Sequence, residues 1–180
     1  MSKKVLLVVD VQTAMIDDQP YNYENVIANI KQLLQVARAS HTEVVYVRHD
    51  GGSGDIMEAG GDGWQIYHEI APMDGEKIFE KNFNSAFKNT GLKEYLDSQN
   101  VTTIILVGLQ SEYCIDTTCK CAFEYGYKLI MPEETNSTYD NEFMSGEELY
   151  RFYNYKIWNG RFARVIPVKE AIQYIESTVY

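Results

Sequence analysis

The amino-acid sequence predicts an α/β fold in which a six-stranded, mostly parallel sheet lies between two layers of helices. Short runs of β-branched and aliphatic residues, typical of strands buried on both faces, alternate along the chain with longer segments of helical spacing. The chain has 180 residues, which fits one domain able to bury about 70% of the surface exposed by its unfolded form. We therefore expect residues 1–180 to form a single domain.

The first third of the chain shows the alternation clearly. Val5–Val9 is a continuous apolar run and predicts a strand buried on both faces. Apolar residues recur at helical spacing over residues 24–38, and residues 44–47 predict a second strand. Six glycines lie within residues 51–63, which indicates a long surface loop. Residues 77–80 then predict a short third strand.

The middle of the chain continues the same pattern. Residues 92–96 predict a short helix, and residues 102–107 predict the fourth strand. Apolar residues recur at helical spacing over residues 115–123, so a helix follows that strand directly. Residues 127–131 predict the fifth strand.

The last third supplies the remaining elements. Ser145 and Glu148 match a capping box that opens a helix, and Gly160 suits the end of that helix. Residues 164–166 predict the sixth strand, and residues 171–175 predict part of a terminal helix. Ligands of parallel sheets bind at the carboxyl ends of the strands, so residues that follow strands are the first functional candidates.

The charge balance argues against binding to nucleic acid or to a membrane surface. Lys and Arg number 16 against 26 Asp and Glu, a formal net charge of −10. Phosphate backbones and anionic lipids repel so acidic a surface. We expect a small-molecule partner instead.

The cysteines and the amino terminus point to the cytoplasm. Cys114, Cys119 and Cys121 lie within eight residues of one another, which is no disulfide framework and suggests a reducing compartment. Asp10 interrupts the apolar run Val5–Val9, which is too short for a signal-peptide core or a membrane span.

Three chemically active residues fall at expected strand ends. Asp10 follows the first strand, where a carboxylate costs free energy unless it is paired, and Lys81 follows the third. Cys114 lies between the fourth strand and the next helix, and with Ser111 near the N-cap the first helical turn would stabilise its thiolate. Each has an ordinary structural explanation when taken alone. Together, a thiol, a carboxylate to take its proton and an ammonium to hold the charge are the parts of a covalent hydrolase.

We expect neither a metal nor a cofactor. The cysteine spacing, C-x4-C-x-C with no histidine nearby, matches no standard zinc or iron–sulfur pattern. His41, His49 and His68 are isolated from one another, and the glycine loop lacks the G-K-[ST] ending of a phosphate-binding loop. Trp64 closes that loop and is a candidate lid over a pocket.

With these residues in view, the chain resembles the isochorismatase-like cysteine hydrolases over almost its whole length. The most specific segment is 108–118, Gly-Leu-Gln-Ser-Glu-Tyr-Cys-Ile-Asp-Thr-Thr, which contains Cys114. The supporting segments are 9–12 (Val-Asp-Val-Gln), 47–52 (Val-Arg-His-Asp-Gly-Gly), 63–64 (Gly-Trp) and 81–87 (Lys-Asn-Phe-Asn-Ser-Ala-Phe).

The resemblance implies a three-layer α/β/α fold around a six-stranded parallel sheet and a homo-oligomer, a dimer or a tetramer. It implies a catalytic triad of Asp10, Lys81 and Cys114 beside a non-proline cis peptide bond, here Leu109–Gln110. The oxyanion hole would be formed by the backbone N–H groups of Gln110 and Cys114.

In the reaction that this resemblance implies, Asp10 accepts the thiol proton of Cys114 while Lys81 keeps Asp10 oriented. The thiolate attacks an amide-like carbonyl and forms a thioester, which water then hydrolyses. We expect four side chains to contact the substrate: Gln12, Trp64, Phe83 and Tyr113.

Two other functions remain open from the sequence. An isochorismatase-type enzyme would cleave a vinyl ether with Asp10 as the acid, although the retained Cys114 favours hydrolysis of a C–N bond. The same sheet could also serve as a non-catalytic small-molecule-binding domain in which the cysteines are only packed. Nicotinamidases of this group carry a metal-binding D-x-H pair, and residues 48–50 (Arg-His-Asp) do not supply that spacing.

Overall fold

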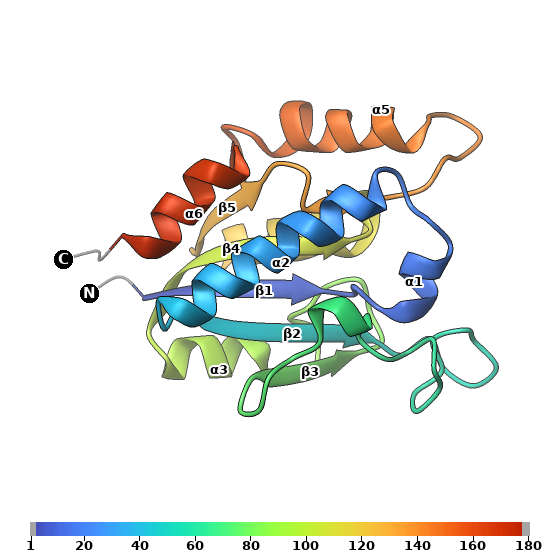
Figure 1. The fold of residues 1–180 in the computed structure, drawn as a ribbon, viewed down its shortest axis with the longest axis horizontal. Helices are drawn as coiled ribbons and strands as arrows, with labels where there is room; N and C mark the ends of the chain where they lie inside the picture. The colour runs from blue at the N-terminus through green and yellow to red at the C-terminus, as the bar shows by residue number, and fades with distance from the viewer. Residues whose placement is uncertain (1–2, 178–180) are drawn as a thin grey trace.

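The computed structural model, which describes residues 3–177, has a central parallel sheet (Figure 1). Its six main strands follow the order β3–β2–β1–β4–β5–β7, and all neighbours are parallel. Their bounds are β1 (Lys3–Val9), β2 (Glu43–His49), β3 (Lys77–Lys81), β4 (Val101–Leu109), β5 (Lys128–Pro132) and β7 (Arg164–Ile166). A two-residue strand, β6 (Asn136–Ser137), pairs with the carboxyl end of β4. The predicted α/β fold is confirmed, with one short strand that the apolar pattern did not reveal.

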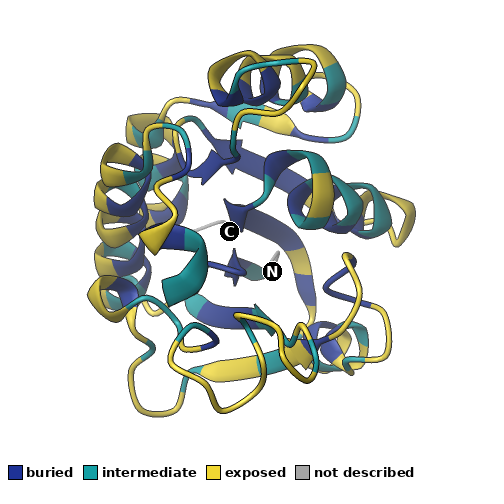
Figure 2. Cartoon of the chain, turned by 90° about the vertical axis from the view of Figure 1, so that its right-hand side faces the viewer, coloured by how far each residue is buried: buried dark blue, intermediate teal, exposed yellow. Residues whose placement is uncertain are grey.

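Helices cover both faces of the sheet, so the fold has three layers (Figures 1 and 2). Alternate residues of β1 pack into two separate hydrophobic clusters, because successive side chains of a strand point to opposite faces. One cluster is closed by α3 (Leu92–Ser98) and α4 (Asp116–Glu124), and the other by α2 (Tyr23–Ala39) and α6 (Val168–Glu176). Burial on both faces is the reason that the strands appear in the sequence as continuous apolar runs.

Five shorter helical segments complete the described chain. They are α1 (Thr13–Asp17), the 3₁₀ turn η1 (His68–Ile70), the π-helical turns η2 (Ser111–Ile115) and η3 (Phe152–Trp158), and α5 (Gly146–Arg151). The predicted capping box is present, since Ser145 Oγ accepts the Glu148 N–H and the Glu148 carboxylate accepts the Ser145 N–H. Within residues 3–177, no helix is both long and apolar enough to cross a membrane.

Two predicted positions differ from the structure in a way that affects the site. Lys81 is the last residue of β3 and does not follow it, because its main chain still pairs with His49 of β2. Cys114 lies inside η2 and not in the first turn of an α-helix, since α4 begins only at Asp116.

The carboxyl ends of the parallel strands meet along one edge of the sheet. Because β1 lies between β2 and β4, Asp10 emerges between the ends of those two strands. Asp10 adopts a left-handed conformation, with a φ of 53°, and its N–H donates to the Val47 carbonyl at 2.9 Å. Gly108 of β4 has a φ of 131°, and a Cβ at this position would lie 1.9 Å from the Val9 carbonyl oxygen. Only glycine permits this close approach of β4 to β1.

We expect Gly108→Ala to lower the free energy of unfolding by more than about 3 kcal/mol, because the added methyl group would overlap the main chain of β1. Gly126→Ala is the matched control, since Gly126 has a φ of 88° but a Cβ added there would meet no atom within 4 Å. This control should lose only about 1–2 kcal/mol through backbone strain. Urea unfolding measures both losses, and equal losses would contradict the close-approach argument.

Candidate active site

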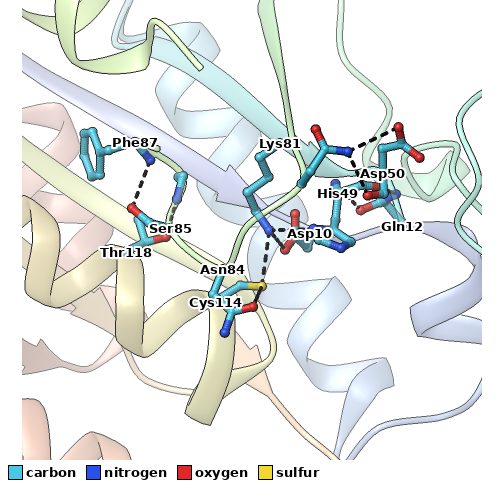
Figure 3. Close-up of polar contacts among 12 residues, drawn as sticks. Asp10, Gln12, His49, Asp50, Lys81, Asn84, Ser85, Phe87, Cys114 and Thr118 are labelled. Atoms are coloured by element: carbon cyan, nitrogen blue, oxygen red, sulfur yellow. Dashed lines mark hydrogen bonds and ion pairs between the residues drawn. The ribbon is translucent and has the colours of Figure 1, made fainter. Parts of the chain in front are cut away.

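Four side chains meet at the carboxyl edge of the sheet (Figure 3). Lys81 Nζ is the common centre: it lies 2.6 Å from Asp10 Oδ2, 3.2 Å from Cys114 Sγ and 3.2 Å from His49 Nδ1. The four residues come from the ends of β1, β2 and β3 and from the turn after β4. The structure therefore brings together the three residues of the expected triad and adds a histidine to them.

Lys81 is almost completely buried, with 1% of its surface exposed. An ammonium group carries three hydrogens, and the three contacts give each of them an acceptor. Burying a charge costs several kcal/mol unless it is paired and hydrogen-bonded. The carboxylate, the sulfur and the imidazole nitrogen together meet that requirement.

Asp10 is buried as deeply as its partner, with 3% of its surface exposed. Burial raises the pKa of its carboxyl group, and the nearby Lys81 ammonium opposes that rise. Oδ2 binds Lys81, while Oδ1 is buried and has no hydrogen-bond donor among the described residues. The Cys114 side chain also lowers the pKa of this carboxyl group, and both residues contact the same Lys81 ammonium.

Cys114 is partly buried, and its sulfur lies 4.0 Å from Asn84 Oδ1 as well as next to Lys81. Burial raises the pKa of its thiol to about 12, the Asp10 carboxylate adds to the rise, and Lys81 opposes it. The direction of this shift is opposite to the sequence-based expectation of a stabilised thiolate. The reason is that the single positive charge of Lys81 is already neutralised by Asp10, so a thiolate would be a second negative charge in a buried place.

Buried polar side chains hold the turn that precedes Cys114. The Leu109–Gln110 peptide bond is cis, at the position that the resemblance implies. Ser111 Oγ donates to Asn136 Oδ1 at 2.8 Å, and the amides of Asn136 and Asn154 exchange two hydrogen bonds of 2.9–3.0 Å. All three side chains have no exposed surface. A satisfied buried network of this kind fixes a single conformation of the turn.

Two of the four expected substrate contacts belong to the scaffold instead. Gln12 is completely buried, and its amide binds the main chain of His49 and Trp64. Trp64 has only 9% of its surface exposed, and the Arg48 guanidinium packs 3.2 Å from the centre of its ring system. Arg48 and His49 are consecutive in β2, so their side chains point to opposite faces of the sheet. Trp64 thus packs on the face away from His49.

The other two expected substrate contacts, Phe83 and Tyr113, are exposed, and they lie close to Lys81 and Cys114 in the sequence. Phe83 has 42% and Tyr113 has 51% of its surface exposed. Tyr113 precedes Cys114 directly, and the Lys88 ammonium lies 3.7 Å from the centre of the Phe83 ring. Both remain free to contact a bound molecule.

Sequence reasoning missed three polar residues around the site. His49 contacts Lys81, and Asn84 contacts Cys114. Asp50 joins the glycine loop to the segment that follows β3. The Asp50 carboxylate accepts the N–H groups of Gly52 and Ala59 and lies 3.3 Å from the Asn82 amide. The available signal for His49 and Asp50 was the segment 48–50, which holds three polar residues at a strand end. Over residues 3–177, no group of three or more His, Cys, Asp or Glu side chains is placed to hold a metal ion.

The fold and the site define an α/β protein with an Asp, a Lys and a Cys at the carboxyl edge of a parallel sheet. Comparison with known families makes this specific: a sequence profile of the isochorismatase domain matches residues 4–166. The chain belongs to the isochorismatase family.

Individual relatives share sequence and fold with the chain. It is 32% identical to a streptothricin hydrolase of Streptomyces noursei over 76% of its own length and 50% of that protein. It is 28% identical to an N-carbamoylsarcosine amidase of Arthrobacter sp, over 86% of the chain and 62% of the relative. A cysteine hydrolase of Pseudomonas syringae pv. phaseolicola superposes with a TM-score of 0.86 at 25% identity, over 97% and 92% of the two chains. The chain therefore spans about half the length of the streptothricin hydrolase that it matches.

We predict that Asp10→Asn lowers the pKa of Cys114. The Asp10 carboxylate raises that pKa, and without it the Lys81 ammonium would pair with the thiolate alone. Alkylation of Cys114 by iodoacetamide at a fixed pH near 8, resolved by mass spectrometry, should accelerate about tenfold or more.

Lys81→Met is the opposite control, because it removes the charge that lowers the pKa of Cys114. Its alkylation should be slower than that of the wild type. Cys121, which is partly exposed, serves as the internal reference in every sample. An unchanged rate for Cys114 in Asp10→Asn would show that the carboxylate does not act on the thiol. A slower rate would contradict the expected fall in the thiol pKa and would show that the carboxylate assists attack as a base.

Proposed function

We propose that this protein is a cysteine hydrolase that cleaves an amide-like C–N bond of a small molecule through a thioester on Cys114. The observation that carries the proposal is the buried Lys81 ammonium in contact with both the Asp10 carboxylate and the Cys114 sulfur. A nucleophile, a base and a group that orients the base are the minimum for covalent hydrolysis. The amidase among the relatives favours C–N cleavage over cleavage of an ether.

In the first half of the reaction, Asp10 takes the proton of the Cys114 thiol as Sγ attacks the carbonyl carbon. A C–S bond forms, and the electron pair of the carbonyl moves to its oxygen. The backbone N–H groups of Gln110 and Cys114 stabilise this oxyanion, and each such donor contributes about 3 kcal/mol or more in acyl transfer. When the intermediate collapses, the C–N bond breaks, and Asp10 gives its proton to the leaving amine.

In the second half, a water molecule loses a proton to Asp10 and attacks the thioester carbon. The C–S bond breaks, the carboxylic acid leaves, and the proton returns from Asp10 to the Cys114 sulfur. Asp10 therefore accepts one proton and releases it again in each half of the reaction. Burial raises the pKa of its carboxyl group, which suits a residue that must hold a proton between two steps.

The pKa of Cys114 also fits this order of events. Burial raises the pKa of the thiol, which favours a Cys114 that holds its proton until attack, and that proton can then pass through Asp10 to the leaving amine. We further propose that Phe83 and Tyr113 contact the substrate, since both are exposed and are close in sequence to Lys81 and Cys114. We propose residues 1–180 as one domain, because the two hydrophobic clusters share one sheet.

We expect Cys114→Ala to lose hydrolysis of its amide substrate by at least about a thousandfold, since the acylation step requires the sulfur. The assay screens a panel of small primary amides, carbamoyl and ureido compounds for release of ammonia or amine. Brief reaction followed by acid quenching and mass spectrometry should find the acyl group on the peptide that contains Cys114.

Cys121→Ser is the matched control, because Cys121 is partly exposed and lines a groove with Ser85 and Tyr125. It should retain the rate of the wild type. A vinyl ether is added to the panel, and its cleavage by a protein that cleaves no amide, retained in Cys114→Ala but lost in Asp10→Asn, would instead favour ether cleavage with Asp10 as the acid. No turnover combined with tight binding of a panel compound would favour a binding domain.

A further inference from the structure

The third acceptor of the Lys81 ammonium is a histidine for which the reaction above gives no task. His49 Nδ1 lies 3.2 Å from Lys81 Nζ, on the side away from Cys114 in Figure 3. The two residues end neighbouring parallel strands and are direct partners in the register of β2 and β3. The contact therefore follows from strand pairing, since side chains of register partners lie on the same face of a sheet.

This contact determines which tautomer the ring adopts. The Lys81 ammonium can only donate, so Nδ1 must be the ring nitrogen without a hydrogen. The proton of the neutral imidazole is then on Nε2. A protonated ring would lack an acceptor and would place a second cation against Lys81.

Gln12 fixes the main chain that carries this ring. Its amide oxygen accepts the His49 N–H at 2.8 Å, and its amide nitrogen donates to the His49 carbonyl at 2.8 Å. A further bond of 3.0 Å reaches the Trp64 carbonyl. Gln12 is completely buried, so His49 is held on both sides of its Cα by a side chain without access to solvent.

We propose that His49 is a positioning residue of this site: its neutral ring accepts the third hydrogen of the Lys81 ammonium, and Gln12 holds it at the distance that this contact requires. The inference rests on the proposed function only for the role of Lys81 in hydrolysis. With Nδ1 occupied, the three hydrogens of Lys81 are directed at three fixed acceptors. Lys81 then cannot turn away from the Cys114 sulfur while Asp10 gains and loses its proton.

The charges around His49 keep it neutral. Burial and the Lys81 ammonium lower the pKa of the ring, whereas Asp10, Asp55 and Asp50 oppose that change. These groups come from β3, from the end of β1 and from the loop after β2, and the Cys114 thiol of η2 faces the same ammonium. A lowered pKa means that the ring gains its proton only at a pH below the ordinary histidine pKa near 6.5. The contact between Nδ1 and Lys81 is lost as the pH falls through the lowered pKa of His49.

The direct test is the state of the ring, read by long-range ¹H–¹⁵N NMR on the full chain. The sequence has only three histidines, so His41→Asn and His68→Asn suffice to assign the signals. We expect His49 to show the Nε2–H tautomer and to titrate below pH 6.5, and Lys81→Met to raise its pKa toward or above the ordinary value. An Nδ1–H tautomer, or a pKa that Lys81→Met leaves unchanged, would overturn the proposal.

A second measurement tests whether His49 keeps Lys81 at the sulfur. Lys81 lowers the pKa of Cys114, so displacement of its ammonium should slow alkylation of that cysteine at fixed pH. We expect His49→Ala to slow it by about threefold to tenfold, toward the rate of Lys81→Met. His49→Asn should restore most of the rate, because its amide oxygen can accept the same hydrogen. His41→Asn is the control, since His41 lies in the turn before β2 with a left-handed φ of 54° that Asn tolerates.

These readouts need no substrate, so they separate this proposal from the proposed function. A correct tautomer together with inactive Cys114 would retain His49 as a partner of Lys81 and overturn hydrolysis. An unchanged alkylation rate of Cys114 in His49→Ala would overturn the positioning role and leave the proposed hydrolase unaffected.

Discussion

The site depends on one constraint, the burial of a lysine ammonium at the edge of a parallel sheet. Lys81 has 1% of its surface exposed, so every hydrogen of its ammonium group must find an acceptor inside the protein. Asp10 supplies the compensating charge at 2.6 Å, and the Cys114 sulfur and His49 Nδ1 complete the set at 3.2 Å each. Removing a partner from a buried pair commonly costs about 3–5 kcal/mol. Stability and the proposed chemistry are therefore linked here, because the interactions that make burial tolerable also hold Asp10 and Cys114, the proposed base and nucleophile, on one ammonium group.

The topology of the sheet supplies the geometry that this burial requires. The strand order β3–β2–β1–β4 places Asp10 at the centre, with Lys81 and His49 on one side and the turn that carries Cys114 on the other. Two local backbone features determine how the ends of β1 and β4 lie relative to each other. The left-handed conformation of Asp10 turns the chain directly after β1, and Gly108 lets β4 approach β1 more closely than any side chain would allow. Residues separated by up to 104 positions thereby share one ammonium group.

Much of this arrangement could be predicted from the sequence, and the remainder could not for identifiable reasons. Strands buried on both faces produce continuous apolar runs, so the sheet and the residues at its carboxyl edge were accessible from the pattern. The state of Cys114 was not, because its pKa depends on Asp10 and Lys81 as neighbours in space. The role of His49 requires the register of β2 against β3, which composition does not encode. Gln12 and Trp64 were expected at the substrate because of their place in the motif, and only their hydrogen bonds and packing show that they support the loop.

The raised pKa of Cys114 bears on the kind of bond that such a site can break. A cysteine stored as a thiolate has already lost its proton, to solvent or to a neighbouring base, and only a base that keeps the proton can pass it to a leaving amine. Burial raises the pKa of the Cys114 thiol, and the Asp10 carboxylate, which is paired with Lys81, adds to that rise, so the environment favours the protonated thiol. In the proposed reaction, the proton that moves to Asp10 as the sulfur attacks is available when the C–N bond breaks, without a separate acid. Oδ1 of Asp10, buried and without a donor among the described residues, can receive it while Oδ2 stays bound to Lys81. One carboxylate held in this way can serve as base and acid in turn, which hydrolysis of an amide demands.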